Sequence, residues 1–380
     1  MSTGSKIAVV SVINDLATDH RVQKACAALA ESGFRVELNG RKLPGSLPLP
    51  DWPYRSHRMK MIFKAGPLFY LFFNARLFFR LLISRVDLLY ANDLDTLLPN
   101  FLVSRIKNIP LIYDSHELFC EVPELQGTPF KKRIWESLEG WVVPRLKHCI
   151  TVNSSIATLF GKKYGVKFNV VRNIPERENN FIPKKREELG LPVDKKIIIL
   201  QGAGINIDRG AEELIMAMAD VDALLLIIGG GDVWEKLGKL VKVTGLGNKV
   251  RLISKIPKGE LMHFTYNADL GISIDKSHNP NYFNSLPNKI FDYIHAGVPV
   301  LASRLPELVK IVNGFGVGGF INNHDPAHIA NCINTMLFSP DVPAWRENAL
   351  RAAGTLNWEN ENQVLMQTIM EATRPLNKNM

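Results

Sequence analysis

The sequence predicts an α/β protein built from two doubly wound, parallel-sheet domains. Three observations predict this fold. Short apolar runs alternate with helical stretches, the alternation restarts after a polar segment near the middle, and 380 residues suffice for two domains of about 100–200 residues each. Strands that are joined through helices pair in parallel, with helices on both faces of the sheet.

The first half of the chain starts this alternation. A buried strand is expected at residues 7–13, followed by a helix at 21–32 and a stop at Gly33. Further strands are expected at 35–38, 88–91, 111–114 and 149–152. The polar stretch at 172–183, which contains Pro175, is interpreted as the linker between the domains.

The second half repeats the pattern. It predicts strands at 197–200, 223–228, 250–253, 270–274 and 300–302, and helices at 211–218, 234–243 and 357–373. The predicted domains are residues 1–176 and 177–356, with 357–380 packing back on the N-terminal domain and 375–380 disordered. Ligands bind such sheets at the carboxyl ends of the strands, so we expect the functional side chains there.

The excess positive charge is confined to the first half. The net charge is +9, and residues 1–180 hold 25 Lys and Arg against 16 Asp and Glu, whereas residues 181–380 hold 21 of each. This asymmetry favours an anionic partner, such as a phosphorylated substrate or an anionic lipid, although an ordinary basic surface explains it as well. No nucleic-acid-binding module is recognisable, so nucleic acid is not expected as a partner.

Cysteine spacing and the N-terminal residues favour a cytoplasmic location. The 4 cysteines show no C-x-x-C spacing, which argues against a structural zinc site and a disulfide framework. A short polar start leads directly into the first apolar strand, without the pattern of a secretory signal.

The most apolar stretch, residues 61–83, is not expected to span a membrane. Lys64, Arg76 and Arg80 interrupt it, and a spanning helix needs about 20 mostly apolar residues. Residues 63–85 instead alternate aromatic and basic side chains, which favours a helix that contacts the anionic inner face of a membrane. A core helix whose arginine heads reach water is the alternative.

Glycine-rich turns follow two strands of the second half. Gly202 and Gly204 form the first turn, with Arg209 shortly before the next helix, and Gly230 is the centre of a three-glycine second turn. Glycines and a helix N-terminus let a phosphate approach the backbone, and an arginine can neutralise it. An ordinary strand-to-helix turn is the alternative at both places.

Charged side chains in two further segments are candidates for function. Lys289 and Asp292 lie one helical turn apart after a polar loop, where a ligand-binding pair and an ion pair within the helix both stay open. His116 follows the strand at 111–114, either as a substrate-orienting or as a structural histidine. Asp19 precedes the first helix and is interpreted as its N-cap.

Taken together, these segments resemble the retaining glycosyltransferases of family 4. That family has the GT-B fold, in which two Rossmann-like domains face each other across a cleft. The resemblance covers nearly the whole chain. It is carried by residues 19–22, 114–117, 171–175, 209–210 and 229–231, and above all by residues 287–300.

The resemblance implies that the C-terminal domain binds a nucleoside diphosphate sugar and the N-terminal domain binds the acceptor, with no metal and no other cofactor. It implies that Arg209 and Lys289 contact the diphosphate and that Asp292 holds the ribose. The implied catalytic residues are His116, which approaches the donor sugar, Arg209 and Lys289. The implied donor-binding residues are Gly202, Gly204, Arg209, Gly230, Ile256, Asn284, Lys289 and Asp292.

Two positions depart from the family pattern. The family's paired glutamates, E-x7-E, appear here as Asn284 and Asp292, so an amide replaces the first carboxylate. Ala203 stands between Gly202 and Gly204, where the family often has a Gly-Arg pair, so one positive charge is missing.

The sequence therefore predicts a metal-independent hexosyltransferase that retains anomeric configuration. The expected acceptor is a saccharide or a lipid-linked molecule, in cell-surface polysaccharide or glycolipid synthesis. Two alternatives stay open: a sugar-nucleotide-binding scaffold without activity, and a nucleotide-sugar 2-epimerase of the same fold.

Overall fold

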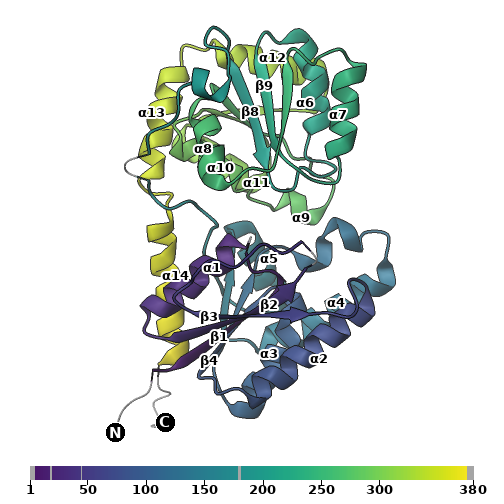
Figure 1. Ribbon diagram of the computed structural model, residues 1–380, viewed down its shortest axis with the longest axis vertical. Coiled ribbons are helices and arrows are strands. Elements are labelled where there is room, and N and C mark those ends of the chain that lie inside the picture. The colour runs from purple at the N-terminus through teal and green to yellow at the C-terminus, as the bar shows by residue number, and fades with distance from the viewer. Residues whose placement is uncertain (1–4, 18, 44, 179–180, 375–380) are drawn as a thin grey trace. The chain divides into compact units, whose positions relative to one another are not determined.

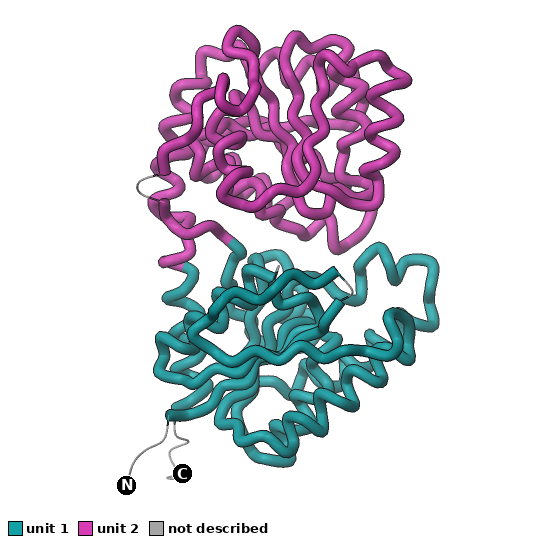
Figure 2. Tube along the Cα trace, viewed as in Figure 1, with its two compact units in different colours: residues 1–173, 361–380 teal, residues 174–360 magenta. Residues whose placement is uncertain are grey.

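The protein consists of two compact units. The structure is a computed structural model that describes residues 5–17, 19–43, 45–178 and 181–374. One unit comprises residues 1–173 and 361–380 and the other comprises residues 174–360, as the two colours of Figure 2 show. The sequence analysis placed these divisions at other residues, after 176 rather than 173 and after 356 rather than 360. Residues 375–380, expected to be disordered, lie outside the described residues.

Unit 1 contains a parallel sheet of seven strands in the order β3-β2-β1-β4-β5-β6-β7 (Figure 1). The strands are β1 (Ile7–Asp15), β2 (Arg35–Lys42), β3 (Arg55–Lys60), β4 (Leu88–Asn92), β5 (Leu111–Ser115), β6 (His148–Thr151) and β7 (Phe168–Val170). The helices are α1 (His20–Glu31), α2 (Pro67–Ile83), α3 (Leu94–Lys107), α4 (Pro129–Val142) and α5 (Ser154–Tyr164). Phe73 and Leu77 of α2 are buried in the same apolar cluster as Val9 and Leu89 of the sheet, so α2 closes one face of it.

Unit 2 contains a parallel sheet of six strands in the order β10-β9-β8-β11-β12-β13. The strands are β8 (Ile197–Gly202), β9 (Leu224–Gly229), β10 (Val250–Ser254), β11 (Leu270–Ser273), β12 (Val300–Ser303) and β13 (Gly318–Ile321). The helices are α6 (Ala211–Ala217), α7 (Trp234–Val243), α8 (Lys258–Tyr266), α9 (Pro280–Phe283), α10 (Lys289–His295), α11 (Pro306–Phe315), α12 (Pro326–Leu337) and α13 (Val342–Ala353). Two apolar clusters divide the buried side chains of this sheet, which is therefore covered on both faces.

The last helix, α14 (Trp358–Thr373), belongs to unit 1 from Glu361 onwards. Glu361 forms an ion pair of 2.7 Å with Arg172 and also accepts a hydrogen bond from the Arg172 backbone N–H. Asn169 donates to Thr368 over 3.0 Å. These bonds attach the end of the chain to the unit that contains its beginning.

The apolar strand predictions agree with the structure, but three strands were not predicted. β3, β7 and β13 all lie at an edge of a sheet. β3 reads Arg-Ser-His-Arg-Met-Lys and has one buried residue, because an edge strand lacks a neighbour on one side. The predicted linker, 172–183, has no regular structure over its described residues 172–178 and 181–183, and residues 179–180 lie outside the described part.

The order of the strands reverses direction at one point in each sheet, which we call the switch point. Successive connections run outward from β1 and from β4 in unit 1, and from β8 and from β11 in unit 2. The crevice at the carboxyl ends of such a pair is where open α/β sheets bind ligands. The loops after β4, β8 and β11 therefore occupy the binding positions of their units. No helix in the described part of the chain is both long and apolar enough to cross a membrane.

Candidate active-site residues

In unit 2, a buried carboxylate holds the two predicted phosphate-binding cations. Asp275, which follows β11, is 0% exposed. Its carboxylate lies 2.9 Å from the Arg209 guanidinium and 3.9 Å from Lys289 Nζ. Arg209 comes from the loop after β8 and Lys289 from the first turn of α10, so three segments converge at the switch point of the sheet.

The environment of these cations keeps Arg209 charged. Burial alone would lower the pKa of Arg209, but Asp275 raises it above its ordinary value. Burial and the nearby Arg209 lower the pKa of Lys289, against the opposing effect of Asp275. The guanidinium also lies over the Tyr282 ring, 4.1 Å from its centroid, and Arg209 Nε makes no hydrogen bond to any described residue. Two cations thus share one carboxylate, so the group has an excess of positive charge that is suited to binding an anion.

Asp292 lies in a separate polar group at the end of β8. It accepts a hydrogen bond of 3.0 Å from Gln201 Nε2, and Thr265 donates to Gln201 Oε1 over 2.7 Å. Lys258 lies 3.7 Å from the other Asp292 oxygen. Burial raises the pKa of Asp292, and Lys258 and Gln201 offset part of this effect. Since Lys289 and Asp292 have different ionic partners, the alternative of an ion pair within α10 is wrong.

The glycines of the two turns differ in whether the surrounding backbone requires them. A Cβ at Gly229 would overlap the carbonyl oxygen of Gly202, and a Cβ at Gly231 would overlap that of Ile205. Gly229 and Gly231 also have φ of 151° and 153°, so the protein's own backbone demands these glycines. At Gly202 and Gly204 a Cβ would meet nothing closer than 3.5 Å, so neither is required by close packing.

The remaining donor-binding candidates border the same edge of the sheet. Gly230 follows β9, and Ile256 follows β10, where it packs against the apolar core. Asn284 ends the short helix α9, where its Nδ2 donates to the carbonyl oxygen of Pro280 over 2.8 Å. One amide N–H of Asn284 therefore serves the helix end, and its contact with a donor sugar stays a prediction.

In unit 1, His116 lies between two carboxylates. Its Nδ1 is 3.1 Å from Asp93 and its Nε2 is 3.6 Å from Asp114. Burial alone would lower the pKa of His116, but Asp93 and Asp114 raise it well above its ordinary value. The two carboxylates therefore favour the charged form of the His116 side chain.

Asp114 is itself held by Arg21 and Tyr90. The Arg21 guanidinium donates two hydrogen bonds to Asp114, of 2.7 and 3.1 Å, and the Tyr90 hydroxyl donates a third of 2.8 Å. Burial alone would raise the pKa of Asp114, but Arg21 and His116 hold it below its usual range. Asp19, next to Arg21, caps α1 by accepting from the Val22 N–H, which confirms its interpretation as an N-cap.

Asp93 occupies the loop after β4 in a strained conformation. Its φ of 58° is rare for a residue other than glycine and costs roughly 1–3 kcal/mol. The Asp93 carboxylate accepts from the His116 backbone N–H over 2.8 Å, in addition to its contact with the ring. Nearby, burial and the charge of Asp93 raise the pKa of Asp95 well above its ordinary value. Strain and a buried carboxyl at a switch point make this loop a candidate for function.

Sequence reasoning missed Asp275, Gln201 and Asp93. Each of them lies at the end of a strand or close to it: Gln201 is the penultimate residue of β8, Asp93 directly follows β4, and Asp275 is the second residue after β11. A search for polar residues at the carboxyl ends of the strands nearest each switch point would have found all three.

The fold of the two units and the paired cations of unit 2 define a class of protein. Two doubly wound domains, one with paired cations at its switch point, have the architecture of the GT-B glycosyltransferases. The family model described as "Glycosyl transferases group 1" matches residues 181–352, and that described as "Glycosyltransferase Family 4" matches residues 20–176. The chain therefore belongs to the family 4, or group 1, glycosyltransferases.

Solved structures and curated relatives agree with this assignment. A sucrose-phosphate synthase from Thermosynechococcus elongatus superposes with a TM-score of 0.79 at 19% identity, over 96% of this chain and 98% of that one. Anabaena Alr3699/HepE in complex with UDP-glucose gives 0.73 at 17% identity, over 96% and 99%. At these identities the likeness shows the fold.

Among curated relatives, the D-inositol 3-phosphate glycosyltransferase of Corynebacterium jeikeium is 26% identical over 48% of this chain and 45% of its own length. D-inositol 3-phosphate glycosyltransferase 1 of Catenulispora acidiphila is 26% identical over 68% and 65%. The chain thus spans about half to two thirds of the length of these relatives.

Proposed function

We propose that the protein transfers a sugar from a nucleoside diphosphate sugar to a saccharide or lipid-linked acceptor, with retention of configuration. The observation that carries this proposal is the pair of cations, Arg209 and Lys289, held by one buried carboxylate at the switch point of unit 2. The complex of Anabaena Alr3699/HepE with UDP-glucose, a protein of the same fold, supports a nucleotide sugar as the donor.

The chemistry follows from the charge that develops on the leaving group. As the bond between the anomeric carbon and the diphosphate oxygen breaks, the diphosphate gains negative charge, and fixed cations stabilise that charge without rearranging. Arg209 is held by a hydrogen bond of 2.9 Å to Asp275, and Lys289 lies 3.9 Å from the same carboxylate, so we expect both cations to need little rearrangement. The acceptor oxygen then bonds to the same face of the anomeric carbon, and its proton leaves with the diphosphate. The two cations supply the neutralisation, so we propose that neither a metal nor another cofactor takes part.

The residues of each unit have separate roles in this proposal. Asp292 accepts hydrogen bonds from the ribose hydroxyls, since a carboxylate can accept two at once. Gly202, Gly204, Gly230 and Ile256 line the nucleotide, and Asn284 contacts the sugar. The charged His116 in unit 1 donates a hydrogen bond to a sugar or acceptor oxygen. The cellular role that we propose is cell-surface polysaccharide or glycolipid synthesis at the cytoplasmic side of the membrane.

Incubation with a panel of nucleotide sugars tests the function itself. A glycosyltransferase releases nucleoside diphosphate, slowly without acceptor, and a chelator leaves the rate unchanged. Binding without release would indicate a scaffold, and an altered sugar on an intact nucleotide would indicate an epimerase.

His116→Ala should lower the rate of sugar transfer while leaving nucleotide affinity nearly intact, because His116 belongs to unit 1 and the nucleotide site is proposed in unit 2. An equal loss of transfer and of nucleotide affinity would contradict this assignment.

Removal of either cation should weaken nucleotide binding. We expect Arg209→Ala and Lys289→Ala each to lose about 1.5–3 kcal/mol of affinity for the nucleoside diphosphate, because each contact is charge-assisted. Isothermal titration calorimetry measures the loss. Lys236→Ala, which removes an exposed cation of α7 in the same unit, is the matched control and should bind normally. Unchanged binding by both site variants would place the diphosphate elsewhere.

The Asn284 and Asp292 positions should separate nucleotide from sugar recognition. Asp292→Ala should weaken the free nucleotide and the nucleotide sugar alike, whereas Asn284→Ala should weaken only the nucleotide sugar. Asn284→Glu should shift the preference among donors, because a carboxylate accepts hydrogen bonds but does not donate them. Calorimetry with both ligands decides the matter. If Asn284→Ala treats the two ligands identically, Asn284 serves only the end of α9.

Helix α2 should bring unit 1 to an anionic membrane. Its inner face buries Phe69, Phe73, Leu77 and Leu81, but Leu71, Phe79 and Ile83 are 66%, 62% and 84% exposed on the outer side. An exposed apolar helix with flanking arginines can lie in the membrane interface. We expect Leu71→Ser/Phe79→Ser to reduce flotation with anionic liposomes. Absence of salt-sensitive flotation by the unmodified protein would contradict the proposal.

A further inference from the structure

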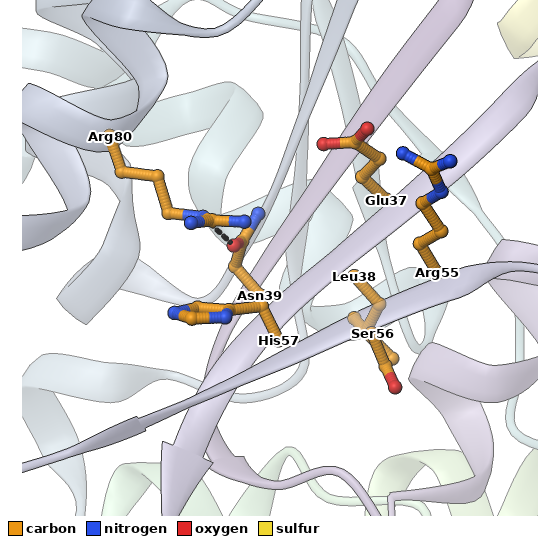
Figure 3. A pocket seen from close by; sticks show the side chains of 7 residues that line it. All are labelled: Glu37, Leu38, Asn39, Arg55, Ser56, His57 and Arg80. Atoms are coloured by element: carbon orange, nitrogen blue, oxygen red, sulfur yellow. Dashed lines mark hydrogen bonds between the residues drawn. The ribbon is translucent and has the colours of Figure 1, made fainter.

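A small polar hollow lies beside β3, the outermost strand of unit 1, and none of the residues assigned to glycosyl transfer lines it. Its volume is about 300 Å³, at the lower end of the range of roughly 300–1,000 Å³ for small-molecule sites. Figure 3 shows the side chains that line it: Glu37 and Asn39 from β2, Arg55 and His57 from β3, and Arg80 from α2.

The pairing of the strands explains why these side chains meet. In the parallel register, Glu37 lies opposite Arg55 and Asn39 lies opposite His57, so all four point to the same face of the sheet. Helix α2 packs on that face, because Met59 of β3 and Phe73 of α2 are buried in the same apolar cluster. Arg80 reaches from α2 to Asn39, whose Oδ1 accepts a hydrogen bond of 2.6 Å from Arg80 Nε. The buried Asn39 therefore fixes the guanidinium at the wall of the hollow.

The hollow carries an excess of positive charge. In the part of the chain that the structure describes, neither Arg55 nor Arg80 forms an ion pair with a carboxylate. Glu37 is the carboxylate of the lining, and Arg35 lies 3.9 Å from it. Burial and the charges of Arg80 and Arg76 lower the pKa of His57. Two arginines without an ionic partner, one of them held in place, are suited to a divalent oxyanion.

The position of the hollow separates it from the glycosyl-transfer residues. It is lined by residues 37–39 of β2 and residues 55–57 of β3, which lie before the carboxyl ends of these strands. His116 and Asp93 instead follow the carboxyl ends of β5 and β4, near the centre of the sheet. The lining of the hollow therefore shares no residue with the group around His116.

We infer that this hollow is a phosphate-binding site, formed by Arg55, Arg80 and His57, which takes a phosphate monoester. The exposed apolar side of α2 indicates the source. Phe79 and Ile83 flank Arg80 along the same helix, so a phosphate in the hollow would lie beside side chains suited to acyl chains. A phospholipid headgroup is thus the ligand that the surroundings favour, and the inference does not depend on the sugar-transfer reaction.

The test uses the full-length protein and the double variant Arg55→Gln/Arg80→Gln. Glutamine at position 80 keeps an amide that can still bond Asn39, so the fold is retained. Lys162→Gln is the matched control, because Lys162 is an exposed cation of α5 beside β7, at the opposite edge of the same sheet. One arm measures binding to phosphatidylcholine vesicles with and without phosphatidic acid. The other arm follows the His57 ring signals by nuclear magnetic resonance as inorganic phosphate is added.

We expect the double variant to bind phosphatidic acid vesicles about tenfold more weakly, while Lys162→Gln binds as the unmodified protein does. Inorganic phosphate should raise the pKa of His57 in the unmodified protein and leave it unchanged in the double variant. A response to inorganic phosphate without vesicle binding would keep the phosphate site and assign it a soluble ligand. Equal losses in Lys162→Gln and the double variant, or no response in either arm, would overturn the inference.

Discussion

Asp275→Asn is expected to destabilise unit 2 by about 3–5 kcal/mol, because removal of one partner from a buried ion pair leaves the opposite charge uncompensated. Here two cations, Arg209 and Lys289, lose the carboxylate that they share. Asparagine has nearly the same shape, so the change is one of charge. The free energy of unfolding, measured in urea at neutral pH, checks this expectation.

A second substitution in the Asp275→Asn background gives the expectation a sharper form. Lys289→Met removes one of the two stranded charges, so the double variant should regain part of the lost stability. Glu260→Gln is the control, since Glu260 pairs with Lys184 at the surface and its loss should leave the midpoint unchanged. Equal stability of Asp275→Asn and the unmodified protein would show that Asp275 does not hold the cations.

Nucleotide should compensate for the missing carboxylate. A nucleoside diphosphate that binds Arg209 and Lys289 supplies the negative charge that Asp275→Asn lacks, and a ligand of the folded state raises stability by mass action. We therefore expect the nucleotide to raise the Tm of Asp275→Asn by more than that of the unmodified protein. A smaller increase would mean that the diphosphate does not lie at these cations.

Asp114→Asn is expected to have a comparable effect in unit 1, again about 3–5 kcal/mol, because the buried Arg21 loses the carboxylate that accepts two of its hydrogen bonds. Asp19→Asn is the matched control. Asp19 caps the helix that contains Arg21, and asparagine caps helices as well as aspartate does. Chemical denaturation of both variants tests the difference, and similar small losses would contradict a special role of Asp114.

The same substitution should change the titration of His116. Asp114 helps to raise the pKa of His116 above 6.5, so Asp114→Asn should lower that pKa. Because the folded-state pKa is raised, the stabilisation by charged His116 is fully present below pH 6.5 and is lost as the pH rises through the folded-state pKa. The stability difference between the unmodified protein and His116→Gln should therefore shrink as the pH increases above 6.5. A difference independent of pH would mean that His116 is neutral.

The architecture and most of the candidate positions could be predicted from the sequence. Buried parallel strands are continuous apolar runs, so the central strands such as β1, β8 and β9 could be located from their residues alone. A helix N-cap depends on its neighbours along the chain, so Asp19 could be assigned as well. Arg209, Lys289 and His116 were candidates because strand ends and helix starts are visible in the sequence.

Only the tertiary structure decided which side chains meet. Asp275 lies 66 residues from Arg209 in the chain, and Asp114 lies 93 residues from Arg21, so no local pattern reveals either pair. The edge strand β3 was missed because it has a single buried residue, and with it the hollow that Arg55 and Arg80 line. Apolar periodicity records burial along one segment, whereas an ion pair or a site depends on the register in which distant segments pack. That register places Asp93 and Asp114 beside His116, and Arg209 and Lys289 beside Asp275, and it arises only when the sheets form.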